Sequence, residues 1–253
     1  VRAEEAEAAD VIAYAATFSA EGKDQTARGV LEKGLDDFGN DVSLLLALAS
    51  VCRRTGDTAS ATTALERALA LHPSSPTALV ALRDVLFECQ GWRRGAEIQK
   101  RLLDLRPADE RERNRFDGAR FEAALAAPAP ERSILLEQIL ADRPDFVPAL
   151  LAQAELLETS GQTDRALRIL ERGLKRRPAC ELLETLARLS GHDRRRLERA
   201  CQRLASASGH GVSIEASVQR LLAENNAGPV GNGTRPVAEL PRCNDCGRLC
   251  EDW

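Results

Sequence analysis

A spacing of 34 residues recurs along this 253-residue chain and limits the folds that it can adopt. Pro73 and Pro107 are separated by this interval, and so are Pro144 and Pro178. Within each interval, apolar residues recur at the three- and four-residue spacing of an amphipathic helix, first before and then after a short turn. The sequence therefore predicts a series of helical hairpins.

Small residues fall at matching positions in these hairpins. The first helix carries alanine, the turn carries glycine, and the second helix carries alanine or glycine at two positions seven residues apart. The four sets are Ala15, Ala49 and Ala154; Gly22, Gly56 and Gly161; Ala27, Ala61 and Ala166; and Gly34, Ala68 and Gly173. Larger side chains would hold two crossing helices apart. We therefore expect close crossings at these positions.

The period, the small residues and the terminal proline resemble the tetratricopeptide repeat family over roughly residues 8–178. The resemblance implies an all-α fold, a right-handed superhelical solenoid of helical hairpins. We expect a repeat array over residues 1–225, with about five to six hairpins and a capping helix. A flexible linker over 226–241 and a partial rubredoxin-like or zinc-ribbon knuckle over 242–253 would follow.

The expected hairpins differ in regularity. After an acidic, frayed lead-in at residues 1–7, five hairpins are predicted over about 8–38, 42–71, 76–105, 109–141 and 147–178. A shortened sixth would cover 180–206, and the capping helix 212–225. In the third hairpin Arg83 takes the place of the small first-helix residue, and Gly95 the small position of the second helix. The pattern does not predict close packing at that crossing.

Composition fits a solenoid whose interior is filled repeat by repeat. Aromatic residues make up only 4% of the chain, so alanine and leucine must fill the core. Charged residues make up 29%, but the net charge of -4 gives no overall attraction to nucleic acid or to an anionic membrane. No apolar run approaches the ~18 residues of a membrane span. Because the sequence also lacks methionine, we expect it to be cut from a longer chain.

Basic clusters at residues 175–177 and 194–196 are the strongest candidates for a charged surface. The first ends a predicted helix, where cations offset the carbonyl dipole, and aromatic residues that would stack on bases are missing nearby. We interpret both clusters as solvated helix surface. The alternatives are a protein or membrane contact and a nucleic-acid surface.

Cysteines near the C-terminal end carry the chemical signature of a metal site. Cys243, Cys246 and Gly247 form a Cys-x-x-Cys-Gly knuckle, whose two thiolates can hold a metal ion, and Cys250 could add a third. Three interpretations of these cysteines stay open. They are half of a zinc-ribbon or rubredoxin-like site whose second cysteine pair is not in this sequence, a site completed by Cys250 together with a remote histidine or a second chain, or incidental cysteines without a metal. Either site would take one metal ion, zinc rather than iron.

A repeat array followed by this knuckle and by Trp253 is similar to the lipopolysaccharide assembly protein B family. Those bacterial inner-membrane proteins have a cytoplasmic repeat array and a C-terminal rubredoxin-like metal domain. Cys250 is not part of their pattern, and their second knuckle and N-terminal membrane helix are not in this sequence. The resemblance implies a cytoplasmic adaptor at the inner membrane that links a membrane protease, and control of lipid A precursor synthesis, to envelope assembly. A segment absent from this sequence would provide any membrane attachment.

The repeat resemblance also implies a concave groove lined by the first helix of each hairpin. The residues expected to face it are Leu46, Ser50, Arg53, Val80, Asp84, Phe87, Leu151, Glu155 and Glu158. Their apolar and acidic side chains favour a partner segment of basic character. Because phosphate loops, nucleophile elbows and paired-histidine motifs are not found, we expect a non-catalytic scaffold that binds proteins. The alternative is a metal-dependent redox or electron-transfer module on a repeat scaffold.

The knuckle predicts about one zinc ion per chain, and a Cys243→Ser, Cys246→Ser variant should lose it because two thiolate ligands are removed. Elemental analysis of both full-length proteins measures this. Iron with a reversible redox transition would favour the electron-transfer alternative, and metal-free protein in both cases would contradict the site.

Overall fold

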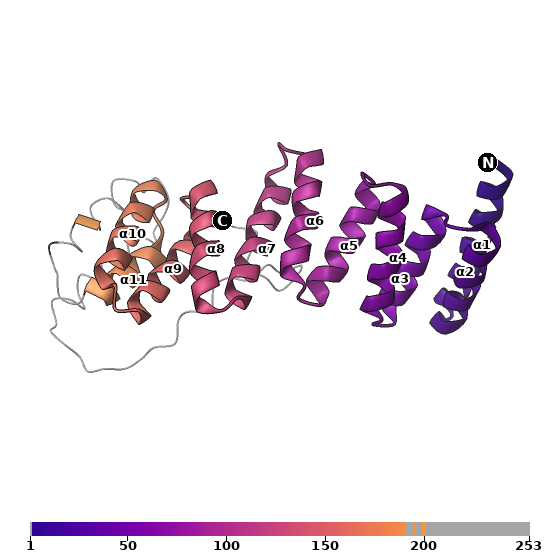
Figure 1. Cartoon of the computed structure of the whole chain (residues 1–253), viewed down its shortest axis with the longest axis horizontal. Coiled ribbons are helices and arrows are strands. Elements are labelled where there is room, and N and C mark those ends of the chain that lie inside the picture. Colours follow the sequence, from indigo (N-terminus) through magenta and orange to yellow (C-terminus); the bar gives the residue numbers. More distant parts are fainter. Residues whose placement is uncertain (1, 191–194, 196–198, 201–253) are drawn as a thin grey trace. The chain divides into compact units, whose positions relative to one another are not determined.

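The computed structural model describes residues 2–190, 195, 199 and 200, and this part of the chain is built of α-helices (Figure 1). Its helices are α1 (Arg2–Ala20), α2 (Asp24–Phe38), α3 (Val42–Arg54), α4 (Thr58–Leu71), α5 (Pro76–Glu88), α6 (Trp92–Leu105), α7 (Glu110–Ala126), α8 (Ala129–Asp142), α9 (Val147–Thr159), α10 (Thr163–Arg176) and α11 (Cys180–Ser190). Neighbouring helices pack in pairs: α1 with α2, α3 with α4, α5 with α6, and α9 with α10.

These bounds confirm the predicted helical hairpins, but the first hairpin begins earlier in the chain than predicted. The hairpins expected over 42–71, 76–105 and 147–178 agree with the observed helices to within two residues. The frayed lead-in was wrong, because α1 begins at Arg2. Alanine and glutamate dominate its first turns, and both are strong helix formers. The helix α11 opens the expected sixth hairpin. Most of its second half, the capping helix and the linker lie outside the described residues.

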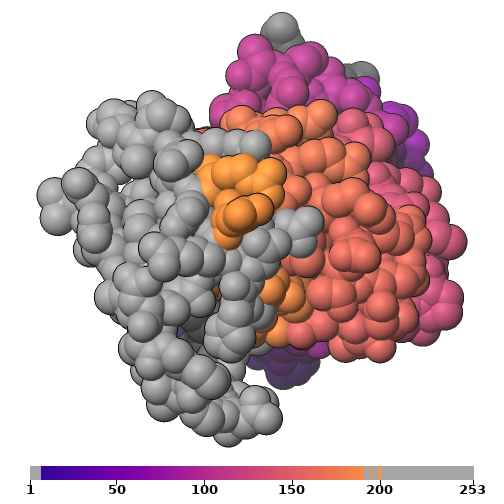
Figure 2. All heavy atoms as spheres, turned by 90° about the vertical axis from the view of Figure 1, so that its left-hand side faces the viewer, coloured from indigo at the N-terminus to yellow at the C-terminus, as the bar shows by residue number. Residues whose placement is uncertain are grey.

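The described residues divide into two compact units, unit 1 up to Ala119 and unit 2 from Arg120 onward. Unit 1 has one apolar core, in which Leu31, Leu45 and Leu65 are fully buried. Unit 2 has a cluster around Ile139 in α8 and a second cluster around Leu170 in α10. Side chains of α9, α10 and α11 form the salmon-to-orange surface in Figure 2.

The predicted small residues lie at close helix contacts. Every alanine of the four sets is at most 3% exposed. A Cβ atom added to Gly34 would lie 2.8 Å from Val11 Cγ1, and one added to Gly173 would lie 2.6 Å from Leu150 Cδ1. Carbon atoms pack at about 3.5–4.0 Å, so the neighbouring helix already fills the space of a side chain. The crossings are therefore as close as the pattern predicts.

The third hairpin is also closely packed, which its pattern did not predict. A Cβ atom on Gly95 would lie 2.5 Å from Cε1 of Phe87, so α5 and α6 approach as far as a missing side chain allows. Arg83 does not hold them apart, because its long side chain hydrogen-bonds to Gln99 of α6 and to Glu112 of α7.

The turns of four hairpins, α1–α2, α3–α4, α5–α6 and α9–α10, contain a residue in the left-handed conformation. Gly56 closes the α3–α4 hairpin with φ +77°, and the amide of Asp57 donates to the Cys52 carbonyl at 2.9 Å. This conformation is free of steric cost only for glycine. In the third hairpin Gln90 takes it with φ 58°, at the position that is glycine in the other three.

Side chains of one hairpin also hold the next. Asp57 caps the N-terminus of α4 by accepting from the Ser60 amide at 3.0 Å, and Arg28 of α2 donates to the same carboxylate at 2.7 Å. The hydrogen bonds from Ser60 and then from Arg28 lower the pKa of Asp57 to about 2. Arg54 similarly reaches Asp24 at 2.5 Å. Such links join adjacent hairpins in unit 1.

Replacing Gly95 by alanine should destabilise the protein, although alanine is the better helix former. The added methyl collides with the Phe87 ring, and overpacking of this kind costs about 1–3 kcal/mol. Urea unfolding followed by circular dichroism measures the shift of the midpoint. The control is Gly29→Ala in α2, where no atom lies within 4 Å and the change should stabilise by up to about 1 kcal/mol. A stabilised Gly95→Ala variant would contradict the close contact.

Candidate partner-binding site

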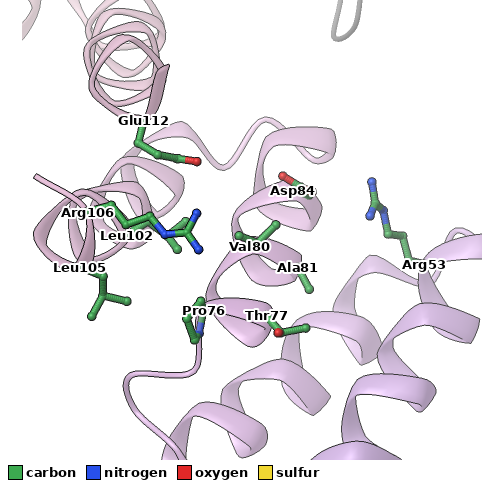
Figure 3. Close-up of a pocket in the computed structure, with 10 residues that line it drawn as sticks. All are labelled: Arg53, Pro76, Thr77, Val80, Ala81, Asp84, Leu102, Leu105, Arg106 and Glu112. Carbon is green, nitrogen blue, oxygen red and sulfur yellow. The ribbon is translucent and has the colours of Figure 1, made fainter. Parts of the chain in front are cut away.

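A pocket of about 490 Å³ opens along α5 in unit 1. Its walls come from the end of α3, the outer face of α5, the end of α6 and the first turn of α7 (Figure 3). The lining residues are Arg53, Pro76, Thr77, Val80, Ala81, Asp84, Leu102, Leu105, Arg106 and Glu112. First helices therefore form much of this pocket.

Apolar side chains line the middle of the pocket. Val80 and Ala81 are half-buried on α5, and Leu102 is buried on α6. Leu105 is 45% exposed, and Leu71 at the equivalent end of α4 is 41% exposed. These side chains form a small apolar surface between charged groups, against which an aliphatic side chain could pack.

Arg53 stands at the α3 side of the pocket and is held by the next hairpin. Its Nε donates to both carboxylate oxygens of Glu88, at 2.9 and 3.1 Å. These hydrogen bonds raise the pKa of Arg53, which stays fully charged. Because a bidentate pair fixes the guanidinium in direction as well as in place, Arg53 is oriented before any partner arrives.

A buried polar cluster forms the base of the opposite wall, and it centres on Arg83. This side chain is only 6% exposed and donates to Asp84 Oδ1 at 2.6 and 2.8 Å and to Gln99 Oε1 at 3.3 Å. It also lies 3.4 Å from Glu112 Oε2. Gln99 is fully buried and donates to the same Glu112 oxygen at 2.5 Å. The cluster joins α5, α6 and α7 through hydrogen bonds, which a charge taken out of water requires.

Arg106 is the charged group of the pocket that keeps free donors. Its guanidinium extends from the end of α6 toward α5 (Figure 3). Within the described residues it has no side-chain hydrogen bond or ion pair, whereas both carboxylates of the pocket already accept from Arg83. The unsatisfied charge in the pocket is therefore positive.

Two segments of the chain match family models described as tetratricopeptide repeat, over residues 42–82 and 135–189. Both segments cover helical hairpins of the structure. The chain contains tetratricopeptide repeats. No curated protein matches the chain.

Several solved repeat proteins are similar to this chain. A tetratricopeptide repeat protein from Parabacteroides merdae has 15% identity and a TM-score of 0.42, covering 85% of this chain and 84% of its own. MamA from Desulfovibrio magneticus has 14% identity and a TM-score of 0.42, covering 66% and 93%. The first repeat domain of Spaghetti, solved with an HSP90 peptide, has 23% identity and a TM-score of 0.40, covering 47% and 96%. The repeat assignment rests on the family models and the hairpins.

Of the nine residues predicted to face a groove, Arg53, Val80 and Asp84 line the pocket together. Ser50 in unit 1 is exposed, and Leu46 is half-buried against the unit 1 core. The ring of Phe87, by contrast, packs inside its own repeat, with its centroid 5.5 Å from that of Trp92. Phe87 therefore does not line this pocket.

The other three predicted residues belong to unit 2. Leu151 packs against the α9–α10 core, and Glu155 is exposed. Glu158 of α9 accepts from Arg188 of α11 at 2.6 and 2.8 Å. A single groove that joins all nine residues remains a prediction.

Sequence reasoning missed the α6 and α7 walls of the pocket. Leu102, Leu105 and Arg106 come from a second helix, and Glu112 comes from the first helix of the fourth hairpin, in which no groove residue was predicted. A signal for the polar cluster was nevertheless present, because Arg83 stands where equivalent repeats have alanine. A charge at a buried repeat position requires partners nearby.

The metal prediction is not tested by the structure. Cys243, Cys246 and Cys250 lie outside the described residues. Among the residues that are described, histidine, cysteine and acidic side chains form no group of three or more that could hold a metal ion. Cys52 is fully buried there, and burial raises the pKa of its thiol. In the same part of the chain, no helix has the length and apolar character needed to cross a membrane.

Replacing Arg83 by alanine should destabilise unit 1 by about 3–5 kcal/mol, because Glu112 and Gln99 would stay buried without the guanidinium. The control is Arg111→Ala on the exposed side of α7, which should change stability by less than about 0.5 kcal/mol. Urea unfolding of both variants gives the comparison. Equal midpoints for the two variants would show that the cluster does not hold the repeat together.

Proposed function

We propose that this chain is a non-catalytic adaptor that binds a segment of a partner protein in the α5 pocket. The repeats support a protein-interaction scaffold. The observation that favours this pocket is its combination of exposed apolar surface, an oriented Arg53 and an Arg106 with free donors. These features suit a ligand with both an aliphatic side chain and an anionic group.

The charges of the pocket favour an acidic residue in that segment, which revises the basic ligand expected from the sequence. Asp84 and Glu112 already accept from Arg83, so a basic ligand would compete with an internal guanidinium. A ligand carboxylate, however, can accept from Arg106 without breaking an existing bond. An aliphatic side chain beside it would cover Val80 and Leu105.

The pathway and place of this adaptor are a further part of the proposal. The Cys-x-x-Cys-Gly motif after a repeat array supports a relation to lipopolysaccharide assembly protein B, and with it a role in regulating lipopolysaccharide synthesis and envelope assembly. On that proposal the chain acts at the cytoplasmic face of the inner membrane with a membrane protease as partner. Cys243, Cys246 and Cys250 would hold a structural zinc ion. A redox-active iron at the same cysteines is the alternative.

A photocrosslinking amino acid tests the pocket in living cells. Placed at Thr77, which lines the pocket, it should give a covalent adduct with a partner protein; placed at the exposed Thr63 of α4, it should not. An added Arg106→Glu change should weaken the Thr77 adduct by about tenfold, because a charge-assisted hydrogen bond becomes a repulsion. Equal adducts at the two positions, or an adduct indifferent to Arg106→Glu, would contradict the proposal.

A further inference from the structure

A second pocket, of about 290 Å³, lies within unit 2 on the side formed by second helices. Glu137 and Leu140 of α8 form one wall, and Arg165, Ile169 and Arg172 of α10 form the other. Below them lie Leu150 and Gln153 of α9. The adaptor site proposed above lies in unit 1 and uses first helices, so this pocket is a separate feature.

Unit 1 has an equivalent pocket of about 300 Å³, two repeats earlier in the chain. Six lining residues correspond at a fixed offset of 71 residues, the distance from Pro73 to Pro144. The pairs are Glu66 and Glu137, Leu69 and Leu140, Ala70 and Ala141, Arg94 and Arg165, Ile98 and Ile169, and Arg101 and Arg172. We therefore take the residues shared by the two pockets as those that the repeat needs for packing, and look for function in the residues that differ.

The first difference between the two pockets is at their base. Where unit 1 has Leu82, unit 2 has Gln153, which is 2% exposed. The Gln153 amide nitrogen donates to Ser133 Oγ at 3.2 Å and to Glu137 Oε1 at 3.4 Å. Its Oε1 has no hydrogen-bond partner among the described residues. Because leucine suffices for the fold at this position, the unsatisfied carbonyl points to a missing donor.

The second difference is charge. In unit 1, Arg94 pairs with Glu66, and Arg101 donates to the Pro73 carbonyl. The charges lining that pocket balance: Glu66 and Glu97 against Arg94 and Arg101.

In unit 2, Arg165 donates to Gln162, and Arg172 donates to a main-chain carbonyl. Arg176 has no side-chain partner within the described residues, and none of these three arginines pairs with a carboxylate there. Three arginines against Glu137 leave an excess of two positive charges. The pocket is therefore built to attract an anion.

We propose that this pocket binds an acidic segment of a protein partner. Its carboxylates accept from Arg172 and Arg176, an aliphatic side chain packs against Leu140 and Ile169, and a main-chain N–H donates to Gln153 Oε1. An inorganic anion would satisfy the arginines but leave the aliphatic wall uncovered. Arg176, which belongs to the basic cluster at residues 175–177, would then bind the partner in addition to its place at the C-terminal end of α10.

Fluorescence anisotropy of the full-length chain with a labelled peptide, Asp-Glu-Leu-Glu-Asp-Leu, tests the proposal. The amide peptide Asn-Gln-Leu-Gln-Asn-Leu should bind at least about tenfold more weakly. An Arg172→Gln, Arg176→Gln variant should also lose about tenfold in affinity, whereas Arg101→Gln, Arg111→Gln, with the same change in net charge, should lose less than about twofold. Gln153→Leu installs the residue of the equivalent repeat and should cost about threefold through one lost hydrogen bond.

Four results would overturn the proposal. The first is equal affinity for the acidic and amide peptides, and the second is an equal loss in the two double arginine variants. The third is displacement of the peptide by inorganic phosphate at equal concentration, which would make the pocket a simple anion site. The fourth is loss of binding on Arg106→Glu with none on Arg172→Gln, Arg176→Gln, which would assign the peptide to the α5 pocket instead. Circular dichroism of each variant checks that the helices are retained.

Discussion

The structure depends on how closely two helices of a hairpin can approach. Glycine and alanine at a few positions let one backbone lie against the other, as at Gly34, Gly95 and Gly173, where no room is left for a Cβ atom. A left-handed residue in the turns of the first, second, third and fifth hairpins brings the second helix back onto the first. With so few aromatic side chains, the core consists mainly of leucine and alanine, and small contacts repeated many times replace one large central core.

A regular scaffold of this kind makes departures from the pattern informative. Arg83 and Gln153 both replace apolar residues at buried repeat positions, and each brings polar groups into an apolar layer. The consequences differ, because Arg83 finds partners on three helices whereas the Gln153 carbonyl finds none. A satisfied polar group organises the scaffold, and an unsatisfied one marks a place for something else. The α5 pocket lies next to Arg83, and the unit 2 pocket is lined by Gln153.

The repeat period located the hairpins, since proline spacing and small residues are imposed by backbone geometry that varies little between repeats. It could not locate the α5 pocket, because Arg106 and Glu112 reach it from the end of one hairpin and the beginning of the next. Side-chain direction was also out of reach: the same first-helix stripe places Val80 in the pocket and turns Phe87 into its own hairpin. The start of α1 was missed because it depends on helix propensity rather than on apolar periodicity. The metal site remains a prediction from its cysteines.

The Arg83 cluster has a consequence for the order of the hairpins. Most contacts between neighbouring repeats are apolar or exposed, and an exchange of one repeat for another would leave them largely intact. The buried guanidinium is different, since it needs the carboxylate that Glu112 brings from the following helix. Any other helix placed after α6 would leave the guanidinium with Asp84 and Gln99 but without its partner on α7. A single residue, Arg83, thus favours one particular helix after this hairpin, and at this point in the array the repeats are not interchangeable.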